Sequence, residues 1–142
     1  MTIPPFSLFG AVSELFVTAG VIYVVRRNWT RRPFPLAAFV VVALFEAFVN
    51  VMYMATKAAR LSGGAADADA LTPAMRLLYA GHGMLSLLAY LTFVILGVLA
   101  YQDQKRGRHF FPERPALTWA FAALWAVSIV SGEAIFVKRY LL

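Results

Sequence analysis

Four long apolar stretches, separated by short polar segments, dominate the pattern of this sequence. Each stretch stays apolar for about 20 residues or more, the length that a helix needs to cross a bilayer core of about 30 Å. Prolines and clusters of charged residues separate the stretches, and proline suits the first turn of a helix but not its interior. The pattern therefore predicts an all-α fold with a single transmembrane domain over 1–142, a bundle of four transmembrane helices at about residues 6–25, 35–57, 73–101 and 115–138.

Composition supports a membrane protein with little chain left for a soluble domain. Of the 142 residues 61% are hydrophobic and 14% are charged, whereas a soluble domain has roughly 25% charged residues. The net charge of +6 does not indicate nucleic-acid binding, because the basic residues lie at the ends of the apolar stretches, where they orient a membrane protein. The absence of cysteine excludes disulfides, thiolate metal sites and covalently attached haem.

Lysine and arginine are more frequent on one side of the predicted bundle than on the other. The segments after the first and third helices carry eight: Arg26, Arg27, Arg31, Arg32, Lys105, Arg106, Arg108 and Arg114. The opposite ends carry five: Lys57, Arg60, Arg76, Lys138 and Arg139. The positive-inside rule then places both termini on the outer side, and we expect the membrane to be a bacterial inner (cytoplasmic) membrane.

Polar residues interrupt all four apolar stretches. They are Glu14, Glu46 with Asn50 one turn further on, His82 and Glu133. With both termini outside, all five fall between the membrane midplane and the outer surface. Ionisable groups in hydrocarbon cost about 3 kcal/mol each on insertion scales and usually face the interior of the bundle. We therefore expect the four helices to pack around these groups.

Three interpretations of this polar layer remain open. One is a metal site, with His82, Glu46, Glu14 and Glu133 as ligands, because carboxylates and imidazole from facing helices form bundle-core metal sites. Another is a proton path or a quinone-headgroup pocket, in which His82 and Glu46, supported by Asn50 and Glu133, bind the cofactor.

The third interpretation is structural, and it is the one that the sequence favours. The glutamates would hydrogen-bond across helices to Asn50, Ser13, Thr18, Ser86 or Ser131. Glu133, near the surface, would snorkel or pair with Lys138 or Arg139. Gly81 and Gly83, on either side of His82, could admit a neighbouring helix, a lipid or a cofactor, and close packing of a helix is favoured. His109 would be a solvated or headgroup-facing side chain in the basic loop.

The second half of the chain, Arg76 to Leu142, resembles a family of small helical membrane proteins known as domain of unknown function 420. The residues that carry the resemblance are Arg76, Tyr79 and His82 in the third helix, the Arg108-His109 pair in the basic loop, and Trp125, Ser128, Ser131, Gly132 and Tyr140 at the end. The family pattern also has a histidine after a tyrosine at the end of the second helix. This chain has Met54 after Tyr53, so a site built on the family histidines would be incomplete here.

The resemblance implies a link to the assembly of respiratory haem-copper oxidases. We therefore expect a non-catalytic accessory subunit or assembly factor of a membrane respiratory complex, with lipids and larger subunits as its partners. No motif of hydrolases, kinases or nucleotide-binding proteins occurs, so no enzymatic activity is predicted. The alternative is a cofactor-binding membrane protein that holds a metal ion or a quinone near His82, Glu46 and Glu133.

Overall fold

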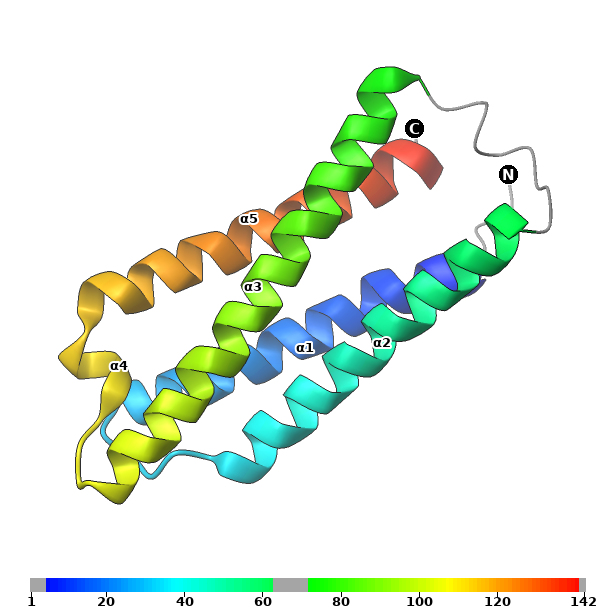
Figure 1. Ribbon diagram of the computed structural model, residues 1–142. Helices are drawn as coiled ribbons and strands as arrows, with labels where there is room; N and C mark the ends of the chain where they lie inside the picture. Colours follow the sequence, from blue (N-terminus) through cyan, green and yellow to red (C-terminus); the bar gives the residue numbers. More distant parts are fainter. Residues whose placement is uncertain (1–4, 63–71, 141–142) are drawn as a thin grey trace.

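The chain forms a bundle of four long helices and one short helix, as the computed structural model of residues 5–62 and 72–140 shows (Figure 1). The helices are α1 (Pro5–Trp29), α2 (Leu36–Ser62), α3 (Pro73–Lys105), α4 (Phe110–Glu113) and α5 (Pro115–Tyr140). The four long helices are long and apolar enough to cross a membrane. The predicted all-α bundle of four transmembrane helices is therefore confirmed.

Several helices extend further than the apolar pattern predicted. α1 continues to Trp29 rather than ending near residue 25, and α3 continues to Lys105 rather than to 101. The 33 residues of α3 span about 50 Å at about 1.5 Å per residue, which is more than a bilayer core of about 30 Å. Apolar patterning marks only the part of a helix that lies in hydrocarbon, whereas arginine, lysine and glutamine continue a helix into water.

The helices α1 and α3 end in the same type of turn at the same end of the bundle. After α1, Arg31 N–H donates to Asn28 O (3.0 Å) and Arg32 N–H donates to Arg27 O (3.0 Å). After α3, Gly107 N–H donates to Gln104 O (2.9 Å) and Arg108 N–H donates to Asp103 O (2.9 Å), which is the same pattern. This is the Schellman motif, in which one residue adopts the left-handed conformation; Arg31 has φ 57° and Gly107 has φ 72°.

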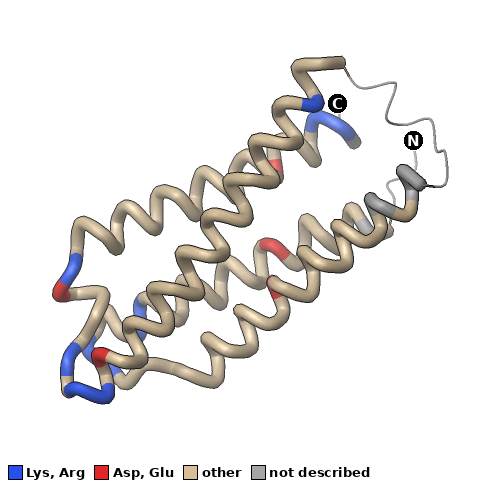
Figure 2. The backbone as a smooth tube through the Cα atoms, in the orientation of Figure 1, with Lys and Arg blue, Asp and Glu red and all other residues tan. Residues whose placement is uncertain are grey.

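Most lysines and arginines lie at this end of the bundle, which we call the basic end (Figure 2). Here the buried carboxylate of Asp103 accepts from Arg108 at 2.5 Å and from Arg114 at 2.8 Å. Next to this network Asn28, which is fully buried, accepts a hydrogen bond from Phe111 N–H at 3.2 Å. These bonds fix the segment that connects α3 to α5 against α1.

The aromatic core lies toward the basic end as well. Phe93 of α3 is its centre, with ring centroids 5.2 Å from Phe39, 6.3 Å from Phe121 and 5.8 Å from Trp125. Gly97, one turn after Phe93, makes this packing possible, because a Cβ atom there would overlap the Phe39 ring. The core thus joins α2, α3 and α5 in one half of the bundle.

Away from the basic end the helices separate into two pairs. α3 packs mainly on α5, and α1 packs mainly on α2, and the two pairs diverge along the bundle (Figure 1). Phe39, near the start of α2, is the one residue of α2 that is buried among those whose burial is described. A Cβ atom added at Gly81 or Gly83 would meet no atom of a neighbouring helix within 4 Å. The close packing expected around these glycines is therefore wrong, and this part of α3 borders open space.

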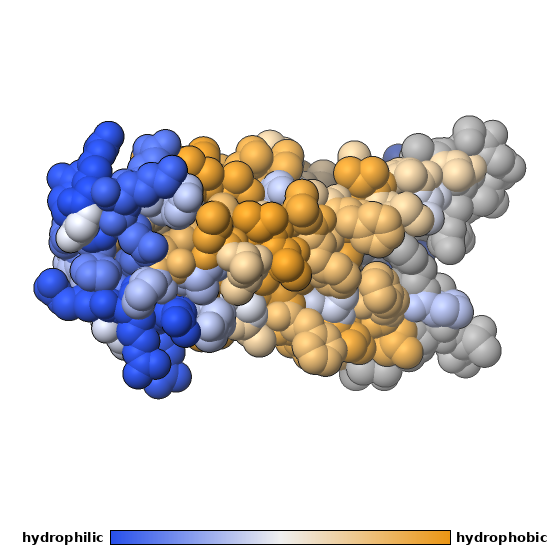
Figure 3. Space-filling model, turned by 90° about the horizontal axis from the view of Figure 1, so that it is seen from below, coloured by the Kyte–Doolittle hydropathy of each residue, from blue (hydrophilic) through white to orange (hydrophobic). Residues whose placement is uncertain are grey.

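The surface agrees with a protein that spans a membrane. Figure 3 shows a hydrophilic basic end followed by a broad apolar band. The apolar band includes large exposed side chains from every long helix, such as Phe16, Val41, Leu77 and Val130. Lipid is the environment in which such a surface is stable.

Candidate functional site

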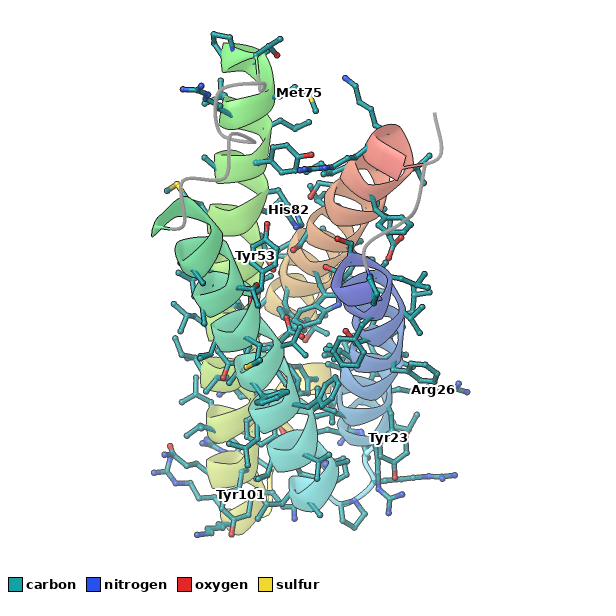
Figure 4. All side chains as sticks on the ribbon, turned by 90° about the vertical axis from the view of Figure 1, so that its right-hand side faces the viewer. Tyr23, Arg26, Tyr53, Met75, His82 and Tyr101 are labelled. Atoms are coloured by element: carbon teal, nitrogen blue, oxygen red, sulfur yellow. The ribbon has the colours of Figure 1, made fainter. Side chains whose placement is uncertain are left out.

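His82 lies between α3 and α5, in the half of the bundle where the helix pairs diverge (Figure 4). Its Nδ1 atom is 2.9 Å from the hydroxyl oxygen of Ser131. The Ser131 hydroxyl in turn donates to the carbonyl of Ser128, one turn earlier in α5, at 2.8 Å. His82 is thus attached to α5 by a chain of two hydrogen bonds.

This chain assigns the tautomer of the imidazole. With the single hydroxyl hydrogen of Ser131 donated to Ser128, as in the bond above, the Ser131 oxygen accepts from His82. Nδ1 therefore carries the hydrogen, and in the neutral ring Nε2 has a free lone pair. Among the residues that the structure describes, none hydrogen-bonds to Nε2. The atom is available to accept a proton or a hydrogen bond from a ligand.

Gly132 brings a carboxyl group from α1 close to this imidazole. A Cβ atom on Gly132 would lie 3.1 Å from Glu14 Oε2 and 3.2 Å from His82 Nε2. The two polar atoms therefore cannot be further apart than the sum of these distances. The missing side chain of Gly132 leaves space into which both groups reach.

Glu46 and Asn50 contribute a second polar group from α2. The side-chain amide of Asn50 donates to Glu46 Oε1 at 3.0 Å and to the Glu46 carbonyl at 2.9 Å. The carboxyl group of Glu14 interacts electrostatically with those of Glu46 and Glu133. The carboxyl groups of Glu46 on α2 and Glu133 on α5 thus lie within electrostatic range of Glu14 on α1.

Glu133 differs from the other acidic residues in having a buried, unpaired oxygen. Its Oε1 atom is inaccessible and accepts no hydrogen bond from any described residue. The expected pairing with Lys138 or Arg139 does not occur among the ion pairs of the described residues. Arg139 instead donates to the Tyr79 hydroxyl at 3.3 Å, which joins the ends of α3 and α5.

Most of the hydroxyl groups expected to bind the glutamates have other partners. Ser13 donates to the carbonyl of Gly10 at 2.9 Å. Thr18 accepts from the Trp125 indole at 3.1 Å, which links α1 to α5. Of the proposed glutamate partners, Asn50 has the expected role, whereas Ser131 binds His82. The side-chain type signalled hydrogen bonding, but only the packing selected the partner.

The surface of α3 and α5 beside His82 forms a groove of about 390 Å³. Its polar members are His82 and Ser131, and its other residues are small or apolar: Ala74, Leu77, Leu78, Gly81 and Leu85. The groove is open to the surface of the bundle, and its walls are mostly apolar with few polar groups, as in ligand sites. A lipid-soluble molecule could reach His82 through this groove without leaving the apolar band.

The structure brings Glu14, His82 and Gly132 together, and Glu46, which is bonded to Asn50, and Glu133 lie within electrostatic range of Glu14. In the described ranges, however, no three histidine, aspartate or glutamate side chains are close enough to form a ligand set for a metal ion. The predicted metal set of His82, Glu46, Glu14 and Glu133 stays a prediction. So does the predicted cofactor set of His82, Glu46 and Asn50.

Sequence reasoning missed two polar residues that organise the basic end, Asp103 and Asn28. Asp103 is an acidic residue next to a cluster of basic ones, which is the signal that could have identified it. His109 was expected to be solvated, but its Nδ1 atom is buried and has no partner among the described residues. The short helix α4 follows His109 directly and packs against α1, α3 and α5.

Comparison of the chain with protein-family models, curated proteins and solved structures finds no match. The resemblance to domain of unknown function 420 rests on residues in the second half of the chain, such as Arg76, Tyr79 and His82.

Proposed function

We propose that this chain is a non-enzymatic membrane protein that binds the polar headgroup of a lipid-soluble cofactor of the quinone class beside His82. The observation that carries the proposal is the free Nε2 atom of His82, held in place through Ser131 and facing the carboxyl group of Glu14. The apolar groove supplies a path for the hydrocarbon part of such a molecule.

The chemistry of the headgroup matches these side chains. The hydroxyl of a quinol would donate to His82 Nε2, and a protonated carboxyl of Glu14 would donate to the carbonyl of a quinone. Burying polar groups in hydrocarbon without partners is costly, so a ligand that completes their hydrogen bonds is favoured.

The test is equilibrium binding of a short-chain quinone to the purified chain in detergent. We expect one quinone per chain for the wild type and a loss of at least about tenfold in affinity for His82→Ala, in line with one lost hydrogen bond at a buried site. Gly83→Ala, at a neighbouring open position, is the matched control and should bind normally. Equal affinity of all three proteins would overturn the proposal. If the wild type instead contains stoichiometric metal that is lost in His82→Ala, the ligand of this site is a metal ion and not a quinone.

The exposed face of α2 favours a second role, as an accessory subunit or assembly factor of a respiratory complex. Beyond Phe39 this helix presents large apolar side chains that no other helix covers, among them Val41, Leu44, Phe48, Val51 and Met54. Lipid alone would satisfy this face, but so would a transmembrane helix of a larger subunit. We propose that oxidase-type subunits bind here, in a bacterial inner membrane.

Affinity purification in mild detergent shows whether lipid or a larger protein subunit covers this face. We expect oxidase subunits to be retained by the wild type and lost from a Leu44→Ala/Phe48→Ala/Val51→Ala variant. A Trp119→Ala/Val127→Ala/Val130→Ala variant removes exposed apolar side chains from α5 instead. This variant should still retain the oxidase subunits. A wild-type preparation that contains this chain alone would contradict the accessory role.

A further inference from the structure

The end of α1 forms a hollow of about 270 Å³ that the proposed cofactor site does not use. Its lining residues are Tyr23, Arg26, Arg27, Thr30 and Arg32, all within ten residues of the sequence. The Schellman motif described above explains how they meet. Its turn at Arg31 reverses the chain, so that Arg32 lies beside the last turns of the helix.

One guanidinium group of the hollow is held rigidly. Arg27 donates to the Tyr23 hydroxyl at 3.1 Å and to the carbonyl of Pro33 at 3.2 Å. A guanidinium has five N–H groups, so Arg27 keeps further donors after making these bonds. The Tyr23 hydroxyl accepts from Arg27 and keeps its own hydrogen to donate. The hollow thus presents several preorganised donors.

The positive charge of the hollow is not neutralised within the described part of the chain. None of its lining residues is acidic. The ion pairs among described residues all involve Asp103, with Arg108 and Arg114. Arg26 and Arg32 have no such partner. The two parts of the basic end therefore differ, because the network around Asp103 contains its own anion and the hollow at the end of α1 does not.

The hollow lies where the apolar part of α1 ends. Ile22, next to Tyr23, is 58% exposed and belongs to the lipid-facing surface. Arg26 extends outward from α1, away from the other helices (Figure 4). A ligand that combines an anionic group with hydrocarbon chains would therefore contact both surfaces at once.

We propose that this hollow binds the phosphate of an anionic phospholipid headgroup in the leaflet that meets the basic end. Arginine matches phosphate because its planar fork donates two parallel hydrogen bonds to two phosphate oxygens. Arg26 and Arg32 supply the unpaired charge, Arg27 and Tyr23 supply fixed donors, and the acyl chains lie along the surface near Ile22. Clusters of lysine and arginine beside the end of a transmembrane helix attract anionic headgroups.

The test is a titration of the purified chain with short-chain phosphatidylglycerol in neutral detergent. Binding is measured as the rise in melting temperature. We expect saturable binding to the wild type and affinity about tenfold or more lower in Arg26→Gln/Arg32→Gln, because each removed arginine weakens attraction to an anionic headgroup. Lys105→Gln/Arg106→Gln removes the same charge elsewhere at the basic end and should keep its affinity within about twofold.

Two further titrations distinguish a lipid headgroup from free inorganic phosphate as the ligand. Short-chain phosphatidylcholine should bind far more weakly than phosphatidylglycerol, and inorganic phosphate in excess should not displace phosphatidylglycerol. Equal weakening of both double variants would overturn the proposal, because the effect would then follow net charge alone. Efficient displacement by inorganic phosphate would also overturn it, since the site would then recognise soluble phosphate.

Discussion

Arg31 and Gly107 occupy the same left-handed position in two equivalent turns, after α1 and α3. Glycine adopts this conformation without steric cost, whereas a residue with a Cβ atom pays about 1 kcal/mol. Gly107 could be anticipated as a turn residue because glycine terminates helices. Nothing in the residue type of Arg31 indicates a left-handed backbone.

We predict that Arg31→Gly raises the free energy of unfolding by about 0.5–1 kcal/mol, because the strain at this position is relieved. Gly107→Ala should lower it by about 1 kcal/mol, because it introduces the same strain into the second turn. Reversible unfolding in mixed detergent micelles measures both changes. A loss of stability in Arg31→Gly would mean that the arginine side chain makes a contribution larger than its backbone strain.

Gly132 is the residue on which the candidate site depends most directly. A Cβ atom there would lie 2.9 Å from His82 Cε1 and 3.1 Å from Glu14 Oε2. Both neighbours are side-chain ends, so the methyl group of an alanine would displace them rather than unfold the protein.

We therefore predict that Gly132→Ala lowers quinone affinity by about tenfold while the protein stays folded, because the imidazole leaves its position. Gly83→Ala adds the same methyl group to open space and should leave binding unchanged. The measurements are quinone titration and circular dichroism of each variant. Unchanged binding by Gly132→Ala would show that the space between Glu14 and His82 is not where the headgroup lies.

Among the elements, α2 and α3 contact each other closely at one crossing. Gly97 of α3 lies beneath the ring of Phe39. Gly20 of α1 lies against Val42 in the same way, since a Cβ atom added there would be 2.5 Å from Val42 Cγ2. Small residues that let backbones approach are the usual basis of helix packing in membranes, where no hydrophobic force drives association.

We predict that Gly97→Ala destabilises the bundle by about 1–3 kcal/mol, the usual cost of overpacking a well-packed core. Gly10→Ala is the control, because a Cβ atom there meets nothing within 4 Å. Its greater helix propensity should stabilise the protein by up to about 1 kcal/mol. A lower melting temperature for Gly97→Ala and a higher one for Gly10→Ala would support this packing. A stabilised Gly97→Ala would contradict it.

The segment between α3 and α5 depends on one buried acid. The side chain of Asp103 is 7% exposed, while its partners Arg108 and Arg114 are 48% and 38% exposed. Replacing Asp103 with alanine should cost about 2 kcal/mol, less than a fully buried pair, because water screens both arginines. The exposed Glu113 is the control, and Glu113→Gln should change the unfolding free energy by less than about 0.5 kcal/mol.

At the scale of the whole molecule, charge decides the orientation in the membrane. The basic end contains eight lysines and arginines, in the last turns of α1 and α3 and in the segments that follow these helices, and only one acidic residue forms ion pairs with them among the described residues. Positive segments are retained on the cytoplasmic side, so we propose that the basic end faces the cytoplasm.

Because the chain contains no cysteine, single-cysteine variants test this orientation without background. We predict that Thr72→Cys, at the start of α3, reacts with a membrane-impermeant maleimide in intact cells. Gly107→Cys, after the end of α3, should react only once the membrane is opened. The reverse pattern would place the basic end outside and would contradict the orientation proposed from the positive charges.

The number of helices and their transmembrane character could be predicted from the sequence alone, because burial in lipid requires long apolar segments whatever their neighbours are. The same local rule located Glu14, Glu46, His82 and Glu133 as rare polar groups in apolar surroundings. Helix ends were less predictable, since α1 and α3 continue through charged residues that are compatible with either helix or loop.

Only the tertiary structure determined which of these groups meet. The approach of Glu14 to His82 depends on the missing side chain of Gly132, and the free Nε2 of His82 depends on the hydrogen bond that Ser131 makes to Ser128. Likewise, the divergence of the helix pairs leaves Gly81 and Gly83 open although their residue type favours close packing. Hydrophobic patterning is a property of each helix by itself, whereas these contacts depend on the rotation and tilt of one helix relative to another.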